Sequence, residues 1–276
     1  MSFTIEDMIL IAEKRYEMKF LAGKNGWANS ISWVHLLEGT TIIQNFWGKE
    51  LAVTTGLGFP QKEDWMHLAR QLNQFHASGL IINVGQYIEE VPKELIAYCD
   101  ENDLPLLTVP WEVHLSDMIK DFSIHVFLQD NTDEQIASAL IKVIETPEKQ
   151  NEYRKELLQH FDVDGSFQVF LLTCEGLDAM DTVERKKLSY RIQVYLEDIT
   201  HNASFFYYNS DFVLVANAVP EEFLYQLIEG AIKRGERRMP ELKLCVGVGS
   251  RCMDISKLSV SYHRAKVAAH MAIVQK

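Results

Sequence analysis

The stretch ELAVTTGLGFPQKEDW, Glu50 to Trp65, carries the clearest signal of secondary structure in this sequence. A short apolar run ends in Thr-Thr-Gly-Leu-Gly-Phe-Pro, and a charged segment with apolar residues at helical spacing follows it. This order indicates a buried strand, then a loop of small side chains and unpaired backbone N–H groups, then a helix that begins near Pro60. In α/β proteins such loops lie where ligands bind, although glycines there also serve simply to turn the chain.

Apolar strands and amphipathic helices alternate around this stretch. The expected strands lie at 31–37, 50–55, 79–85 and 104–110, and the expected helices at about 61–77 and at 92–102. This alternation predicts an α/β domain with a parallel sheet and right-handed crossovers. Because the carboxyl ends of parallel strands meet at one edge of a sheet, the loops that follow these strands should converge there.

The loops at that edge carry residue types that suit a small polar ligand. The candidate ligand-binding residues are His35, Glu38, Thr54, Thr55, Gly56, Gly58, Asn83, Gln86, Trp111 and Glu112. Together they offer hydroxyls, a carboxamide, acids, free N–H groups and an aromatic face. Structural roles would also explain six of these residues: the two threonines as strand ends, the two glycines as turn formers, Trp111 as a lid on the core and Glu112 as a helix cap.

The second half of the chain has a different order of elements. Helical spacing from 114 to about 160, interrupted near Asn131 and Pro147, indicates a helical connector. Beyond it, strands are expected at 166–174 and 242–250, helices at about 181–200, 221–235 and 256–273, and a hairpin over 203–219 that turns at Asn209-Ser210. This order predicts an α+β fold whose sheet contains antiparallel strands.

Composition bounds the class of protein. A chain of 276 residues fits two domains of ordinary size, and 47% hydrophobic with 24% charged residues is typical of globular proteins. No apolar run approaches the roughly 18 residues that a membrane span requires. The N-terminus lacks the basic region and cleavage site of a secretory signal, so we expect a cytoplasmic protein.

Charge and cysteine usage argue against several kinds of site. The formal net charge is −12, and acidic residues outnumber basic ones in both halves, so neither half should attract a phosphate backbone. The four cysteines, Cys99, Cys174, Cys245 and Cys252, are too scattered for a disulfide framework or a metal site. We expect them to be reduced and structural.

Catalytic and nucleotide-binding motifs are absent from the sequence. There is no G-x-S-x-G, no H-E-x-x-H and no G-x-x-x-x-G-K-[ST]. The pair Gly56 and Gly58 resembles part of a dinucleotide fingerprint, but Gln61 stands where the third glycine would fall. We therefore expect no metal ion, no cofactor and no catalytic residues.

Several motifs in order resemble a known family of bacterial regulators. The stretches ISWVHLLEG, GKELAVTTGLGFP, LARQLNQFHASGLIINVG and VPKELIAYCDENDLPLLTVPWEV resemble the N-terminal domain of PucR-family transcriptional regulators, over about residues 4–127. The stretches FFYYNSDFVLVA, LCVGVGS and SYHRAKVAAHMA resemble the GGDEF nucleotide-cyclase fold, over about residues 160–276. The resemblance implies an effector-sensing domain at 1–127, a helical connector at 128–160 and a GGDEF-like domain at 161–276.

The second resemblance also implies a degenerate domain. Active cyclases place two glycines and an acid pair at the hairpin turn, where this chain has Asn209, Ser210, Asp211 and Phe212. Side chains at the glycine positions block close approach of a nucleotide, and one metal-binding acid is missing. The resemblance therefore implies a structural role in dimerisation and signal relay rather than catalysis.

The leading hypothesis is the ligand-sensing and dimerising region of a PucR-like regulator that is not an enzyme. Regulators of this kind carry a C-terminal helix-turn-helix, whereas this sequence stops at Lys276, so operator DNA would be reached only through a domain outside it. The expected effector is a small nitrogen metabolite, either a purine-breakdown product or an amino acid, and the expected assembly is a homodimer or higher homo-oligomer. The alternatives are an enzyme that acts on a nucleotide through the second domain, and a scaffold with a vestigial pocket.

Overall fold

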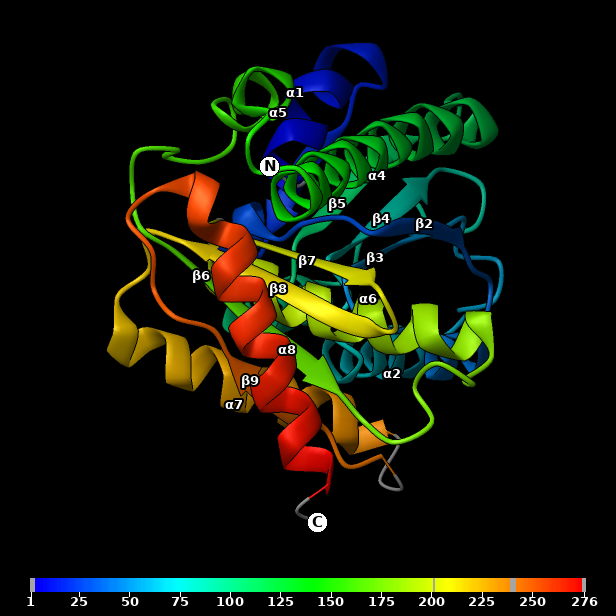
Figure 1. Cartoon of the computed structure of the whole chain (residues 1–276). Helices are drawn as coiled ribbons and strands as arrows, with labels where there is room; N and C mark the ends of the chain where they lie inside the picture. Colours follow the sequence, from blue (N-terminus) through cyan, green and yellow to red (C-terminus); the bar gives the residue numbers. More distant parts are fainter. Residues whose placement is uncertain (1–2, 201, 239–241, 275–276) are drawn as a thin grey trace. The chain divides into compact units, whose positions relative to one another are not determined.

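The chain folds as two compact units, residues 1–130 (unit 1) and 131–276 (unit 2). Figure 1 shows the computed structural model, which describes residues 3–200, 202–238 and 242–274. Each unit consists of a sheet that is covered by helices on both faces.

Unit 1 holds a mixed, mostly parallel sheet of strand order β1-β5-β4-β3-β2. Its elements are α1 (Ile5–Arg15), β1 (Lys19–Ala22), η1 (Lys24–Ala28), β2 (Trp33–Leu36), η2 (Thr41–Asn45), β3 (Glu50–Thr54), α2 (Lys62–Gln74), β4 (Gly79–Val84), α3 (Lys93–Glu101), β5 (Leu106–Pro110) and the first part of α4 (Leu115–Glu145). Strands β2 to β5 pair in parallel, which confirms the predicted α/β fold. The short strand β1 was not predicted, and it pairs antiparallel to β5 at the edge of the sheet.

The apolar runs of unit 1 are buried because helices pack on both faces of its sheet. On one face, Ala52 and Leu80 pack with residues of α2 and α3. On the other face, Leu51, Val53 and Ile81 pack with residues of α1 and α4. A strand that is buried on both sides has no polar face, which explains the continuous hydrophobic sequence of β3 and β4.

The start of α1 is fixed by a capping box. The Asp7 backbone N–H donates to the Thr4 hydroxyl oxygen at 3.2 Å, and the Thr4 N–H donates to the Asp7 carboxylate at 3.0 Å. The two side chains thereby satisfy donors that the first helical turn leaves without a partner.

Unit 2 holds a four-stranded antiparallel sheet of order β7-β8-β6-β9. Its elements are the rest of α4, α5 (Gln150–Leu157), β6 (Phe167–Thr173), α6 (Thr182–Ile199), β7 (Ala203–Tyr208), β8 (Asp211–Asn217), α7 (Glu221–Arg238), β9 (Cys245–Val248), η3 (Ile255–Lys257) and α8 (Leu258–Val274). This arrangement confirms the predicted α+β fold.

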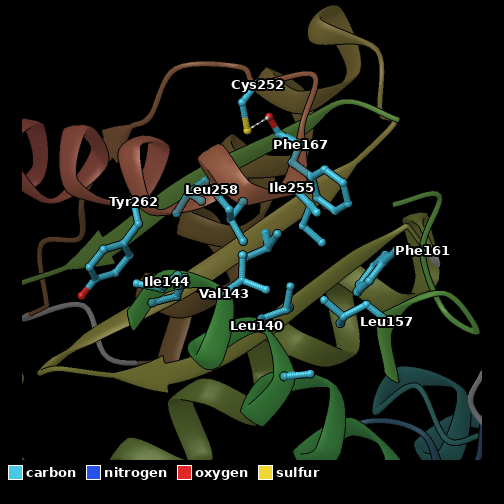
Figure 2. Close-up of a cluster of buried hydrophobic side chains, with 14 of the residues drawn as sticks. Leu140, Val143, Ile144, Leu157, Phe161, Phe167, Cys252, Ile255, Leu258 and Tyr262 are labelled. Carbon is cyan, nitrogen blue, oxygen red and sulfur yellow. Dashed lines mark hydrogen bonds between the residues drawn. The ribbon is translucent and has the colours of Figure 1, made fainter. Parts of the chain in front are cut away.

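Two hydrophobic clusters fill unit 2, one on each face of its sheet. Figure 2 shows the cluster that α4 and α8 cover, where Leu140, Val143 and Leu258 lie among the labelled side chains. In the same cluster the Cys252 thiol donates to the Phe167 carbonyl oxygen at 3.4 Å. The other cluster lies on the opposite face, where side chains of α6 and α7 pack on the sheet.

Helix α4 runs unbroken for 31 residues from Leu115 to Glu145. The interruption expected near Asn131 is therefore wrong, whereas the one near Pro147 is confirmed. Asparagine lowers helix stability by only about 0.7 kcal/mol relative to alanine, and packing offsets this on both sides: Phe122 belongs to a core cluster of unit 1 and Leu140 to one of unit 2.

All four cysteines are free and buried, and burial raises the pKa of the Cys99 thiol to about 12. Among the helices in the described ranges, none combines the length and apolar character that would let it cross a membrane.

Candidate functional site

The predicted site residues lie along the carboxyl edge of the unit 1 sheet. The carboxyl ends of β2 to β5 are neighbours because the strand registers pair His35 with Ala52, Val53 with Ile81, and Asn83 with Val109. Within this edge the structure brings the predicted residues together in three groups. One surrounds Glu38 and the loop after β3, one lies on the loops after β4 and β5, and the third is His35 with Phe46.

The Glu38 carboxylate binds the loop that follows β3. Its Oε1 accepts from the Thr55 N–H at 2.8 Å and from the Thr55 hydroxyl at 2.7 Å. Its Oε2 accepts from the Thr54 hydroxyl at 3.1 Å and from the Gly58 N–H at 3.3 Å. We call these four residues, Glu38, Thr54, Thr55 and Gly58, the clasp. A carboxylate offers about four lone-pair positions, so the clasp donors fill the acceptor capacity of Glu38.

The clasp corrects one expectation about this loop. The sequence predicted unpaired backbone N–H groups, yet those of Thr55 and Gly58 donate to Glu38. The Gly56 N–H donates to the Thr54 hydroxyl oxygen at 3.1 Å. The N–H groups of Thr55 and Gly58 therefore have a partner that the local sequence does not show, because Glu38 lies in the preceding loop.

Both loop glycines are required by the local geometry. Gly56 has φ of +87°, a conformation that side-chain-bearing residues rarely adopt. At Gly58, a Cβ atom would lie 1.9 Å from the Glu38 carbonyl oxygen, so the two loops are in backbone contact there. The turn-forming interpretation of these glycines is therefore sufficient to explain them.

On the neighbouring strands, Asn83 ties the ends of β4 and β5 together. Its side chain is buried, and its Nδ2 donates to the Pro110 carbonyl oxygen at 2.6 Å. Two residues later, Gly85 has φ of +148°, and a Cβ atom there would lie 2.5 Å from Cβ of Trp111. The loop after β4 thus packs directly against Trp111.

This contact creates an open aromatic face. Trp111 is 36% exposed and Tyr87 is 46% exposed, and their rings meet edge to face with centroids 5.5 Å apart. Gln86 and Glu112 are also exposed on these two loops. Trp111 is one of the residues predicted from the sequence, whereas Tyr87 is not, although Tyr87 lies within a loop that was predicted to reach this edge.

His35 lies on β2, half-buried, with its ring stacked on Phe46 at a centroid distance of 5.1 Å. Removal from water disfavours the charged imidazolium, so burial lowers the pKa of His35 below its usual 6.5.

This lowered pKa predicts a pH dependence of stability. Below about pH 6.5 the unfolded chain binds a proton at His35 more readily than the folded chain does, so unit 1 should lose stability as the pH falls from 7 to 5. The His35→Gln variant should lose less over the same range. All five tryptophans, at 27, 33, 47, 65 and 111, belong to unit 1, so tryptophan fluorescence during urea unfolding reports on this unit. Equal losses in His35→Gln and in a control at the exposed His67 would contradict this assignment.

In unit 2, the acidic residue next to the hairpin turn, Asp211, is buried. Asn209 and Ser210 form the predicted turn, with φ of 49° and 70°. Asp211 is 1% exposed, its Oδ2 has no hydrogen-bond partner among the described residues, and His270 Nε2 lies 3.6 Å from it. The carboxylate therefore faces the protein interior and α8. Over the described ranges, no group of three or more His, Cys, Asp and Glu side chains is arranged to hold a metal ion.

Unit 2 also contains an open pocket of about 480 Å³ that the sequence did not indicate. It lies between α4 and α5 and is lined by polar residues that include Gln135, Gln159 and His160. Across it, Lys142 Nζ pairs with the Glu156 carboxylate at 3.3 Å.

Comparison with known proteins yields two family matches and one curated relative. Residues 9–126 match the purine catabolism regulatory protein-like family (PucR), and residues 151–271 match the GGDEF-like domain. The Purine catabolism regulatory protein of Bacillus subtilis (strain 168) is 27% identical over 107 residues, which span 38% of this chain and 20% of that protein.

Proposed function

We propose that this chain, which carries a PucR-family domain followed by a GGDEF-like domain, is the effector-sensing and dimerising region of a bacterial transcriptional regulator. The effector is a small nitrogen metabolite, either a purine-breakdown product or an amino acid, bound at the carboxyl edge of the unit 1 sheet. The observation that supports this most is the convergence of four strand-end loops within the PucR-like part of the chain. Open parallel sheets bind ligands at this edge.

The aromatic face is the part of this edge that suits a nitrogen metabolite. A planar ring or ureide group can lie on the exposed surface of Trp111 and Tyr87 and bury apolar area there. The Gln86 carboxamide and the Glu112 carboxylate, both exposed beside it, can pair with the N–H groups in which such metabolites are rich.

The signal would pass along α4 to the second domain. We take residues 1–127 as the sensing domain, 128–160 as the connector and 161–276 as the GGDEF-like domain. A ligand that binds one arrangement of the dimer more tightly shifts the population toward it. A DNA-binding domain outside this chain would then read that arrangement as a change in operator affinity.

A thermal-shift screen tests the proposal. The panel contains purine bases, nucleosides, ureides and amino acids, and a ligand at about 100 times its dissociation constant stabilises the native state by about 2.7 kcal/mol, a shift of several degrees. We expect one chemical class to act saturably, and we expect Trp111→Ala to abolish the shift while Trp33→Ala, an exposed tryptophan on β2, retains it. A flat panel would instead favour a scaffold.

The environment of Asp211 argues against the enzymatic alternative. A magnesium ion bound to nucleotide needs a carboxylate that faces solvent, and Asp211, at the start of β8, is 1% exposed. Turnover of GTP with magnesium that is lost in Asp211→Ala would establish that alternative and displace the sensor assignment.

A further inference from the structure

The clasp has the composition of a binding site for a free carboxylate. Two backbone N–H groups and two hydroxyls, from Thr54, Thr55 and Gly58, converge on two oxygens at 2.7–3.3 Å. Hydrogen bonds to an ionised acceptor are about twice as strong as neutral ones. A donor set of this kind therefore selects an anion with two oxygens, and in this structure the anion is a side chain of the protein itself.

The donors lie at the end of a strand inside the sheet and in the loop that follows it, whereas the carboxylate comes from the loop after the edge strand. Thr54 is fully buried at the end of β3, which lies inside the sheet. Glu38 is half-buried in the loop after β2, the edge strand. Its neighbour Gly39 borders open space, since a Cβ atom there would meet nothing within 4 Å. The backbone of Glu38 is held against Gly58, so its side chain is the part that can leave the donors.

We propose that the clasp donors form a carboxylate subsite, which Glu38 occupies in the unliganded protein and which the effector's own carboxylate takes over. This inference rests on the proposed function and narrows it: the effector is an acidic nitrogen metabolite, such as an amino acid or a ureido acid, rather than a neutral purine base. Its carboxylate binds the clasp donors, and its planar or N–H-rich part lies toward Trp111 and Tyr87.

The exchange is close to neutral in hydrogen bonds, because each bond that Glu38 gives up is remade by the ligand while Glu38 returns to water. The Glu38 carboxylate competes with the ligand carboxylate for the same donors. Because Glu38 is tethered to the protein, its effective concentration is in the millimolar range that is typical of a short flexible link. A simple carboxylate should therefore bind the wild-type protein poorly, and removal of the Glu38 side chain should expose the subsite.

Acetate and acetamide are the probes for this test, because they share a shape and differ in charge. In ¹⁵N spectra of Glu38→Ala, we expect acetate to shift the Thr55 and Gly58 amides saturably, with a dissociation constant at least about tenfold below that of wild type. Acetamide should shift neither amide. The control Glu101→Ala removes an exposed carboxylate at the end of α3 and should respond to acetate as wild type does.

A second variant guards against a folding defect. Glu38→Gln keeps the size of the side chain, but its one oxygen cannot accept from all four donors, so acetate affinity should fall between wild type and Glu38→Ala. Folded Glu38 variants whose Thr55 and Gly58 amides ignore acetate would overturn the inference.

The proposed function can fail separately. A neutral metabolite that saturates the wild-type protein without moving the Thr55 and Gly58 amides would overturn the carboxylate subsite and leave the sensor role intact. Acetate binding to Glu38→Ala without any metabolite that binds wild type would keep the subsite and overturn the sensor role.

Discussion

The Gly58→Ala variant should lose about 3 kcal/mol of the free energy of unfolding of unit 1. The added Cβ atom would lie 1.9 Å from the Glu38 carbonyl oxygen, which is far inside van der Waals contact. Because the obstacle is backbone rather than a flexible side chain, the two loops must separate. Separation breaks the bond from the Gly58 N–H to Glu38 and weakens the whole clasp. Urea unfolding followed by tryptophan fluorescence measures the loss.

Gly39→Ala is the matched control for this substitution. It adds the same methyl group to the neighbouring loop, where nothing lies within 4 Å of the new atom. Its free energy of unfolding should stay within about 1 kcal/mol of wild type. Similar losses in the two variants would show that the close contact between the loops is not what the glycine at 58 provides.

The Asn83→Asp variant should destabilise unit 1 by about 3 kcal/mol or more at neutral pH. The substitution preserves shape, but it replaces the Nδ2 donor that contacts the Pro110 carbonyl at 2.6 Å with an anionic oxygen. The site is buried, so the new charge would be removed from water and placed against an acceptor.

The pH dependence of this loss identifies its cause. Burial without a partner raises the pKa of the introduced carboxyl group above about 3.9, so the destabilisation should shrink as the pH falls and the group takes up a proton. Gln86→Glu makes the same chemical change at an exposed position on the loop that follows β4 and should cost less than about 0.5 kcal/mol. A loss in Asn83→Asp that does not diminish toward pH 5 would contradict an electrostatic origin.

Most of the fold could be predicted from local sequence patterns. Strands β3 and β4 are buried on both faces, which leaves uninterrupted apolar runs, and the Asn209-Ser210 turn uses residue types that suit its positive φ angles. Strand β1 has only four residues and a break in register between Phe20 and Ala22, so its sequence is too short and irregular to show the alternation that predicts a strand. At Asn131 a weak local preference was outweighed by packing on either side of it.

Only part of the candidate site could be predicted from the sequence. Strand topology placed the candidate residues at one edge of the sheet, but the bonds from Glu38 reach donors 16 to 20 residues away, and they depend on the register of β2 against β3. Tyr87 is part of the candidate site only because its ring contacts Trp111, 24 residues later in the chain. Contacts of this kind leave no local pattern, and so the sequence alone predicted a loop with free donors where the structure has the clasp.

A titration of the ¹⁵N-labelled chain with acidic and neutral nitrogen metabolites would locate the effector site. We expect an acidic metabolite to produce saturable amide shifts that are concentrated at residues 54–58, 83–87 and 111–112. Saturable shifts that instead concentrate around the pocket between α4 and α5, or a panel in which no metabolite saturates, would contradict an effector site at the carboxyl edge of unit 1.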